Sequence, residues 1–318
     1  MKKYIKYLYI IIPVIILIAG SFYFFSNKTE KNILVNGGAE STVKTDTAQT
    51  KEIAIVTSTE VNGYKIEFSS KDISMEGSSK VVVSKDNQKV FEATDAVFSG
   101  FYAGEVGDWI ENAGDLKEKS IKDITGNGIP ELFLDGYSGG AHCCTHNYII
   151  ELSNPISILF DMDTGDSGIE FKDLNNDGVM ELVTREDVFA YWHSSFVGSP
   201  MPEVVLSLQN GKYKADPKYM HKPALTDAEV KKMADDLESW ADKDGIYPAI
   251  AWRMYAIDLV YSGNIASARK YVDLVWRYND DAKFENDKFK TKEDFWKELD
   301  KQIKTSPYYK DLDSFLNL

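Results

Sequence analysis

Two nine-residue stretches of the chain share one pattern: Asp123-Ile-Thr-Gly-Asn-Gly-Ile-Pro-Glu131 and Asp173-Leu-Asn-Asn-Asp-Gly-Val-Met-Glu181. In both, oxygen-bearing side chains occupy positions one, three, five and nine, and a glycine occupies position six. Glycine at that position permits the sharp turn that lets the surrounding oxygens converge. An apolar run of strand-like composition follows each ninth residue, so each stretch predicts a loop that leads directly into a β-strand.

Converging carboxylate and amide oxygens are the ligands that Ca²⁺ prefers in proteins, and we therefore interpret the two stretches as calcium loops. They are not EF-hands, because an EF-hand requires a bidentate glutamate at position twelve, where this chain has Leu134 and Thr184. The ninth residue would have to close each site instead. The alternative is that both stretches are ordinary turns, held by bonds from their own Asp and Asn side chains to the backbone.

A loop of the form Asp-x-Asx-x-Asx-Gly-x-x-acid that runs into a strand resembles the calcium loops of FG-GAP and integrin-α-type β-propeller repeats, over about residues 119–185. For the second loop the resemblance implies ligation by the side chains of Asp173, Asn175, Asp177 and Glu181 and by the Val179 carbonyl. For the first loop it implies the side chains of Asp123, Thr125, Asn127 and Glu131 and the Ile129 carbonyl, with the threonine as a departure from the pattern. Three carboxylates against two predict tighter binding by the second loop.

The N-terminus has the features of a membrane-targeting segment. Three lysines among the first six residues precede an uncharged run from Tyr7 to Phe25, which is long enough to cross a bilayer. We expect an uncleaved transmembrane anchor over residues 1–25, with the N-terminus cytoplasmic because the lysines lie on that side, and the bulk of the chain extracytoplasmic. The alternative is a signal peptide cleaved near Ala19-Gly20-Ser21, which would release a secreted protein.

Composition limits the classes of partner. The formal net charge of −14 argues against nucleic acid, whose phosphates require a basic surface. Residues 26–52 are rich in Asn, Thr, Gly, Lys and Glu, and predict a flexible linker. The length that remains, with 43% hydrophobic residues overall, predicts two domains with real cores: a β-rich calcium-loop domain over 53–220 and a helical domain over 221–318.

Short strand-like runs joined by turn signals mark the β-rich domain. Asn62-Gly63, Asp86-Asn87 and Asn210-Gly211 each lie between strand-like runs, which is typical of two-residue β-hairpins. The two calcium loops begin 50 residues apart (173 − 123), which matches the length of one propeller blade. Only two such units are visible, whereas closed propellers need about four blades, so a partial propeller-like assembly and a sandwich both remain open.

After Asp216 the apolar residues recur with helical spacing. Thr226-Asp-Ala-Glu229 and Thr291-Lys-Glu-Asp294 each predict the start of a helix, and Gly263 predicts the end of another. The segment from Trp252 to Trp276 resembles one tetratricopeptide-type helical hairpin, while a small bundle packed on the β domain is the alternative. The predicted fold class is therefore α+β, with an N-terminal transmembrane helix, a β-rich domain and a C-terminal α-helical domain.

The segment between the two loops allows three different chemistries. Gly136-Tyr137-Ser138-Gly139-Gly140 fits G-x-S-x-G, the nucleophile elbow of α/β-hydrolases, but a strand-like run follows where that fold needs a helix. If residues 142–146 are extended, His142, Cys144 and His146 lie on one face and could hold zinc or copper. Cys143 and Cys144, the only two cysteines, could form a vicinal disulfide or stay as two thiols.

The sequence thus predicts a membrane-anchored extracytoplasmic module that binds Ca²⁺ and has a binding, adhesion or envelope-associated role. The expected partners are the membrane, through the N-terminal helix, and an unspecified protein or glycan. The run Ser138-Gly-Gly-Ala-His-Cys-Cys144 is similar to one in exported bacterial proteins of unknown activity. An exported serine hydrolase that uses Ser138 is the alternative function.

Overall fold

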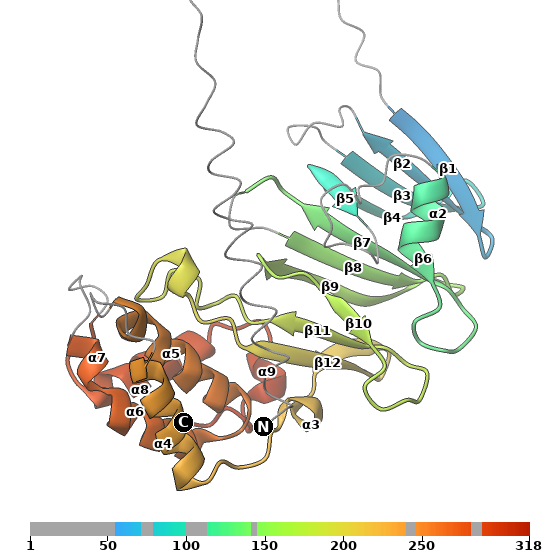
Figure 1. The fold of residues 1–318 in the computed structure, drawn as a ribbon. Coiled ribbons are helices and arrows are strands. Elements are labelled where there is room, and N and C mark those ends of the chain that lie inside the picture. Colours follow the sequence, from blue (N-terminus) through green and yellow to red (C-terminus); the bar gives the residue numbers. More distant parts are fainter. Residues whose placement is uncertain (1–54, 71–78, 100–112, 141–144, 240–245, 281–287) are drawn as a thin grey trace, which may run out of the picture. The chain divides into compact units, whose positions relative to one another are not determined.

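The computed structural model describes residues 55–70, 79–99, 113–140, 145–239, 246–280 and 288–318, which all belong to one compact unit of the chain (Figure 1). Within these ranges the β-strands form three antiparallel sheets that follow one another in the sequence, and helices dominate the chain after the third sheet.

The first sheet is a four-stranded meander in the order β1-β2-β3-β4, with bounds β1 Ile55–Val61, β2 Tyr64–Ser70, β3 Ser79–Lys85 and β4 Gln88–Asp95. The hairpin at Asn62-Gly63 is confirmed, with φ values of 50° and 77°, and so is the hairpin at Asp86-Asn87, with 50° and 61°. Positive φ at both turn residues is what a type I′ hairpin requires, and Asn, Asp and Gly tolerate it best.

The second sheet has the order β5-β7-β8-β9, with β6 paired to β7. Its bounds are β5 Val97–Ser99, β6 Ile121–Lys122, β7 Glu131–Tyr137, β8 Thr145–Glu151 and β9 Ser157–Gly165. The short helix α2, Ala113–Ser120, directly precedes β6. The third sheet has the order β10-β11-β12-β13, with bounds β10 Glu170–Lys172, β11 Glu181–Arg185, β12 Glu203–Gln209 and β13 Lys212–Ala215. The predicted hairpin at Asn210-Gly211 joins its last two strands and is confirmed.

The second sheet is buried on both of its faces. On β7, Leu132 and Leu134 pack into a core shared with the first sheet, while Phe133 between them packs into a core shared with the third sheet. Alternation along a strand sends successive side chains to opposite faces. The described sheets therefore pack in layers, and the second sheet separates two hydrophobic cores.

One short 3₁₀-helix, η1, lies between β11 and β12, and the α-helices from α3 onward follow the third sheet and share its core. Their bounds are η1 Phe196–Gly198, α3 Pro217–Met220, α4 Asp227–Ser239, α5 Ile246–Tyr261, α6 Ile265–Val275, α7 Arg277–Asp280, α8 Lys292–Ile303 and α9 Tyr309–Leu312. Leu182 and Leu206 of the sheet lie in the same buried cluster as Trp252, Val260 and Leu312 of the helical segments. Within the described residues, the third sheet and the helices that follow it therefore share one hydrophobic core.

Helix ends lie where local chemistry predicts them. Glu229 accepts a hydrogen bond from the Thr226 backbone amide at 2.8 Å, and its own amide donates to the threonine hydroxyl at 3.3 Å, which completes the predicted capping box. Gly263, with φ 75°, ends α5. Asn264 lies at the N-terminal end of α6, but its side chain makes no capping bond, and its side-chain amide instead donates to the Lys222 carbonyl at 3.2 Å.

One part of the predicted fold class needs correction. Within the described ranges, no helix is long and apolar enough to cross a membrane. The apolar helix α5 has 16 residues, which corresponds to about 24 Å against the ~30 Å of a bilayer core. The predicted anchor over residues 1–25 lies outside the described residues, as does the linker over 26–52. The transmembrane helix, and membrane attachment through it, are therefore not supported.

Candidate functional site

The two acidic loops occupy equivalent places in neighbouring sheets. The first joins β6 to β7 and the second joins β10 to β11, in each case connecting two paired antiparallel strands. Glu131 pairs with Lys122 and Glu181 pairs with Lys172, so the ninth residue of each loop is the first residue of the following strand. The predicted arrangement of a loop that leads into a strand is confirmed.

The first residue of each loop holds the turn closed. The two carboxylate oxygens of Asp123 accept hydrogen bonds from the amides of Gly126, at 2.7 Å, and Gly128, at 2.9 Å. Asp173 accepts in the same way from the amides of Asp177, at 3.1 Å, and Gly178, at 3.0 Å. The central glycines Gly128 and Gly178 have φ values of 82° and 88°, which residues other than glycine rarely adopt.

The ninth residue points beneath its loop. Glu131 is 0% exposed and accepts from the Ile124 amide at 2.8 Å and from the Thr125 hydroxyl at 3.1 Å. Glu181 is 3% exposed and accepts from the Leu174 amide at 2.8 Å. Burial raises the pKa of Glu131 to about 7, against the effect of its two hydrogen bonds. Both glutamates thus anchor the second residue of their loops.

The side chains at positions three and five also make bonds within or near the loops. Asn127 accepts from the Ile129 amide at 2.8 Å and donates to Glu151 at 2.7 Å. Asn175 donates to Asp177 at 2.9 Å and to the Tyr219 hydroxyl at 2.8 Å, and Asp177 accepts from the Val179 amide at 2.8 Å. These bonds are those expected of the alternative interpretation, in which side chains hold an ordinary turn.

This arrangement corrects the expectation that the predicted ligands of each loop converge on one metal site. In the described part of the chain, no three or more His, Cys, Asp or Glu side chains lie so that they could hold a metal ion. The physical reason in the second loop is the position of Glu181, whose carboxylate is bound to the Leu174 amide under the turn. In the first loop, Thr125 is buried and donates to Glu131, so it does not join the exposed Asp123 and Asn127.

The two loops contact each other, which the sequence pattern did not predict. The Met180 amide donates to the Ile124 carbonyl at 2.8 Å, and the Tyr213 hydroxyl donates to the Met180 carbonyl at 3.0 Å. A Cβ atom on Gly126 would lie 3.1 Å from the Gly178 carbonyl oxygen. The residue equivalent to Met180 in the first loop is Pro130, which has no amide hydrogen, so the reciprocal bond cannot form.

The segment between the loops does not have the context of a hydrolase elbow. Ser138 follows β7 directly, and the next described element is β8, which pairs with β7 as an antiparallel neighbour, whereas a nucleophile elbow requires a helix at this place. His142, Cys143 and Cys144 lie outside the described residues, and the predicted disulfide and transition-metal site lie there with them. His146 is described, and its imidazole lies 2.7 Å from Asp161 and stacks on Tyr148 with 4.5 Å between ring centroids.

A pair of carboxylates, Asp95 on β4 and Asp135 on β7, has no signature in the sequence. Asp135 accepts from the Ser99 hydroxyl at 3.0 Å, while burial and the charge of Asp95 raise its pKa to about 6. A Cβ atom on Gly136 would lie 2.5 Å from a carboxylate oxygen of Asp95, so this glycine is what lets the carboxylate approach β7. Burial also raises the pKa of Asp95. No spacing rule links these residues, because they come from different strands.

Comparison with known proteins gives one short match. A protein of Synechocystis sp. named "Probable thylakoid lumen protein" is 35% identical over 92 residues, which is 27% of this chain and 26% of that protein. The chain thus covers about a quarter of the length of this relative. No family model matches the chain, and no solved structure matches it.

Proposed function

We propose that this protein is an extracytoplasmic binding protein with an adhesion-type or envelope-associated role, and that its paired loops are the element that responds to Ca²⁺. The location is supported by the relative named as a lumenal protein, because a thylakoid lumen lies beyond a membrane from the cytoplasm. The net charge of −14 suits an exterior rich in divalent cations and agrees poorly with anionic partners.

The pairing of the two loops is the observation that carries the proposal. Met180 of one loop binds Ile124 of the other, and five side chains with oxygen acceptors are exposed on this pair: Asp123, Asn127, Asn175, Asn176 and Asp177. Carboxylates held close together repel one another, and a bound cation offsets that repulsion. Bound Ca²⁺ would supply this charge compensation and so stabilise the loop pair.

We expect the affinity for Ca²⁺ to be low, because the buried ninth-position glutamates are not available as ligands. Ligand charge is a main determinant of calcium affinity, and the two buried glutamates are engaged by backbone amides. The second loop keeps Asp173, Asn175 and Asp177 with the Val179 carbonyl, and we propose these as its ligands. Dissociation constants of about 10⁻⁴–10⁻³ M, as in extracellular calcium modules, follow from such a set.

The test is the melting temperature of the purified protein with and without Ca²⁺. With about 10 mM Ca²⁺ and a dissociation constant of about 1 mM, linkage stabilises the folded state by ~1.4 kcal/mol. The double variant Asp173→Asn/Asp177→Asn should lose this response. The matched control is Asp235→Asn on α4, which removes an exposed carboxylate that pairs with Lys231 and belongs to neither loop.

Magnesium serves as a second control, because the smaller ion demands a stricter geometry than Ca²⁺. The proposal is wrong if about 10 mM Ca²⁺ leaves the melting temperature unchanged and equilibrium dialysis finds no bound calcium. It is also wrong if the double variant and Asp235→Asn respond to Ca²⁺ equally, since the stabilisation would then not arise at the second loop.

A further inference from the structure

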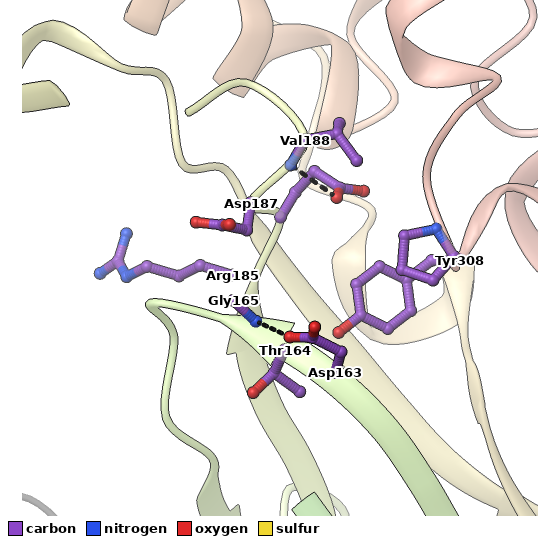
Figure 2. Close-up of a pocket in the computed structure, with 9 residues that line it drawn as sticks. Asp163, Thr164, Gly165, Arg185, Asp187, Val188 and Tyr308 are labelled. Carbon is purple, nitrogen blue, oxygen red and sulfur yellow. Dashed lines mark hydrogen bonds between the residues drawn. The ribbon is translucent and has the colours of Figure 1, made fainter. Parts of the chain in front are cut away.

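A cavity of about 370 Å³ lies at a junction of three segments (Figure 2). The end of β9, the end of β11 with the residues that follow it, and the C-terminal segment before α9 line it, and Asp163, Gly165, Arg185, Glu186, Asp187 and Tyr308 are among the lining residues. Its volume lies within the ~300–1,000 Å³ of small-ligand sites. It is made of residues that none of the sequence motifs contains.

Glu186 lines this cavity and holds the surrounding segments together. Glu186 is 1% exposed, and its carboxylate accepts hydrogen bonds from the Tyr261 hydroxyl at 3.1 Å, from the Val188 amide at 3.3 Å and from the Ser306 hydroxyl. These bonds tie the C-terminal segment and α5 to the chain after β11. The acceptor capacity of Glu186 is therefore largely used within the protein.

Asp187 has acceptor capacity left. One of its carboxylate oxygens, Oδ1, is buried and has no hydrogen-bond partner among the described residues. The other, Oδ2, would lie 2.1 Å from a Cβ atom on Gly165, so the glycine is what permits this position of the carboxylate. Burial and the charges of Asp166 and Asp163 raise the pKa of Asp187.

Tyr308 supplies an aromatic wall and a second buried polar atom. Tyr308 is 2% exposed, and its hydroxyl has no hydrogen-bond partner within 3.5 Å among the described residues, although the Thr184 side chain interacts with it from beyond that distance. Figure 2 shows the hydroxyl directed toward Asp163 and Thr164 across the cavity. Arg185 lines the cavity, but among the described residues its guanidinium forms no ion pair with Asp163 or Asp187 and instead donates to the Met201 carbonyl at 3.2 Å.

We propose that this cavity binds a guanidinium group. The ligand must be cationic, because Asp163 and Asp187 carry the charge that the cavity leaves uncompensated. It must donate hydrogen bonds, because the buried Asp187 Oδ1 atom lacks a partner among the described residues. A planar guanidinium satisfies both conditions, pairs well with carboxylates and stacks on an aromatic ring. The proposal is independent of Ca²⁺ and of the paired loops.

Calorimetric titration with two probes tests the proposal and separates two sources of the group. Agmatine carries a free guanidinium, and a blocked Gly-Arg-Gly peptide carries it as a side chain. Binding of agmatine alone assigns a small-molecule ligand, whereas binding of the peptide assigns an arginine of a partner chain. The analogue in which a neutral urea replaces the guanidinium keeps the ammonium group of agmatine, and it should not bind if the guanidinium is the group that the cavity recognises.

The variants Asp187→Asn and Asp163→Asn should each weaken binding by about tenfold or more, and Tyr308→Phe by a few fold. Asp163 is exposed, so its substitution keeps the test valid if Asp187→Asn does not fold. Asp235→Asn, which removes the same charge from α4, should bind like wild type. Failure of both probes to bind, or unchanged affinity in Asp163→Asn and Asp187→Asn, would overturn the proposal.

Discussion

Single residues decide how closely the backbone and the carboxylates of this protein approach one another. Gly126 and Gly128 belong to the same loop and have similar positive φ values, 69° and 82°. They differ in surroundings, because only Gly126 faces the Gly178 carbonyl, whereas a Cβ atom on Gly128 would meet nothing within 4 Å. Alanine substitutions at these two glycines can therefore separate the cost of backbone strain from the cost of disturbing the contact between the loops.

We predict that Gly128→Ala destabilises the protein by about 1 kcal/mol through its positive φ alone. Gly126→Ala should cost about 1 kcal/mol more, because the added methyl group must push the second loop away. Urea denaturation of both variants measures the difference. Equal costs would mean that the two loops can separate without loss of stability.

Asp135 links stability to pH. Its pKa is raised from 3.8 to about 6 in the folded protein, mainly by burial. Protonation of Asp135 therefore stabilises the folded state. Its contribution to the free energy of unfolding is fully present below about pH 4 and is lost as the pH rises through about 6. A rise of about two units corresponds to at most ~3 kcal/mol.

The variant Asp135→Asn stays neutral and should lose this pH dependence. Its Oδ1 atom can still accept the bond from Ser99, which limits the direct cost of the substitution. Denaturation at about pH 4 and about pH 7.5 should show a smaller fall in unfolding free energy for the variant than for wild type. A fall of equal size in both proteins would exclude Asp135 as its source.

Elements show what local sequence can and cannot predict. The hairpins at Asn62-Gly63 and Asn210-Gly211, the capping box at Thr226 and the loop-to-strand transitions at Glu131 and Glu181 were all predictable, because each depends on residues adjacent in the chain. The inward direction of the two glutamates was not, because it depends on burial beneath the loop. Contacts between distant segments, such as Met180 with Ile124, leave no periodic signal.

The contact between the loops offers a direct test at the level of the element. Met180→Pro places in the second loop the residue that the first loop has at Pro130, and removes the donor to the Ile124 carbonyl. We expect Met180→Pro to be less stable than Met180→Ala by about 1 kcal/mol, since both lose the side chain and only proline loses the hydrogen bond. Thermal denaturation compares them. Equal stability would mean that this bond contributes nothing.

At the scale of the whole molecule, the third sheet and the helices depend on each other. Their apolar side chains form one buried cluster, and Glu186 after β11 binds both Tyr261 of α5 and Ser306 before α9. The sequence predicts a β-rich domain over 53–220 and a helical domain over 221–318. That boundary rests on composition and apolar spacing, which carry no information about whether the two segments share a core. We expect this packing to couple the unfolding of the two parts.

We therefore predict a single unfolding transition. Four of the six tryptophans, Trp192, Trp252, Trp276 and Trp296, pack in or against the hydrophobic cluster that the helices share, so fluorescence reports mainly on that cluster. Far-ultraviolet circular dichroism also reports on the sheets. The two probes should give coincident midpoints in urea. Leu312→Ala, which removes a fully buried side chain near the C-terminus, should lower both midpoints together at a cost of about 2–5 kcal/mol. Separate transitions, with only the fluorescence midpoint lowered by Leu312→Ala, would instead establish that the helices and the sheets fold independently.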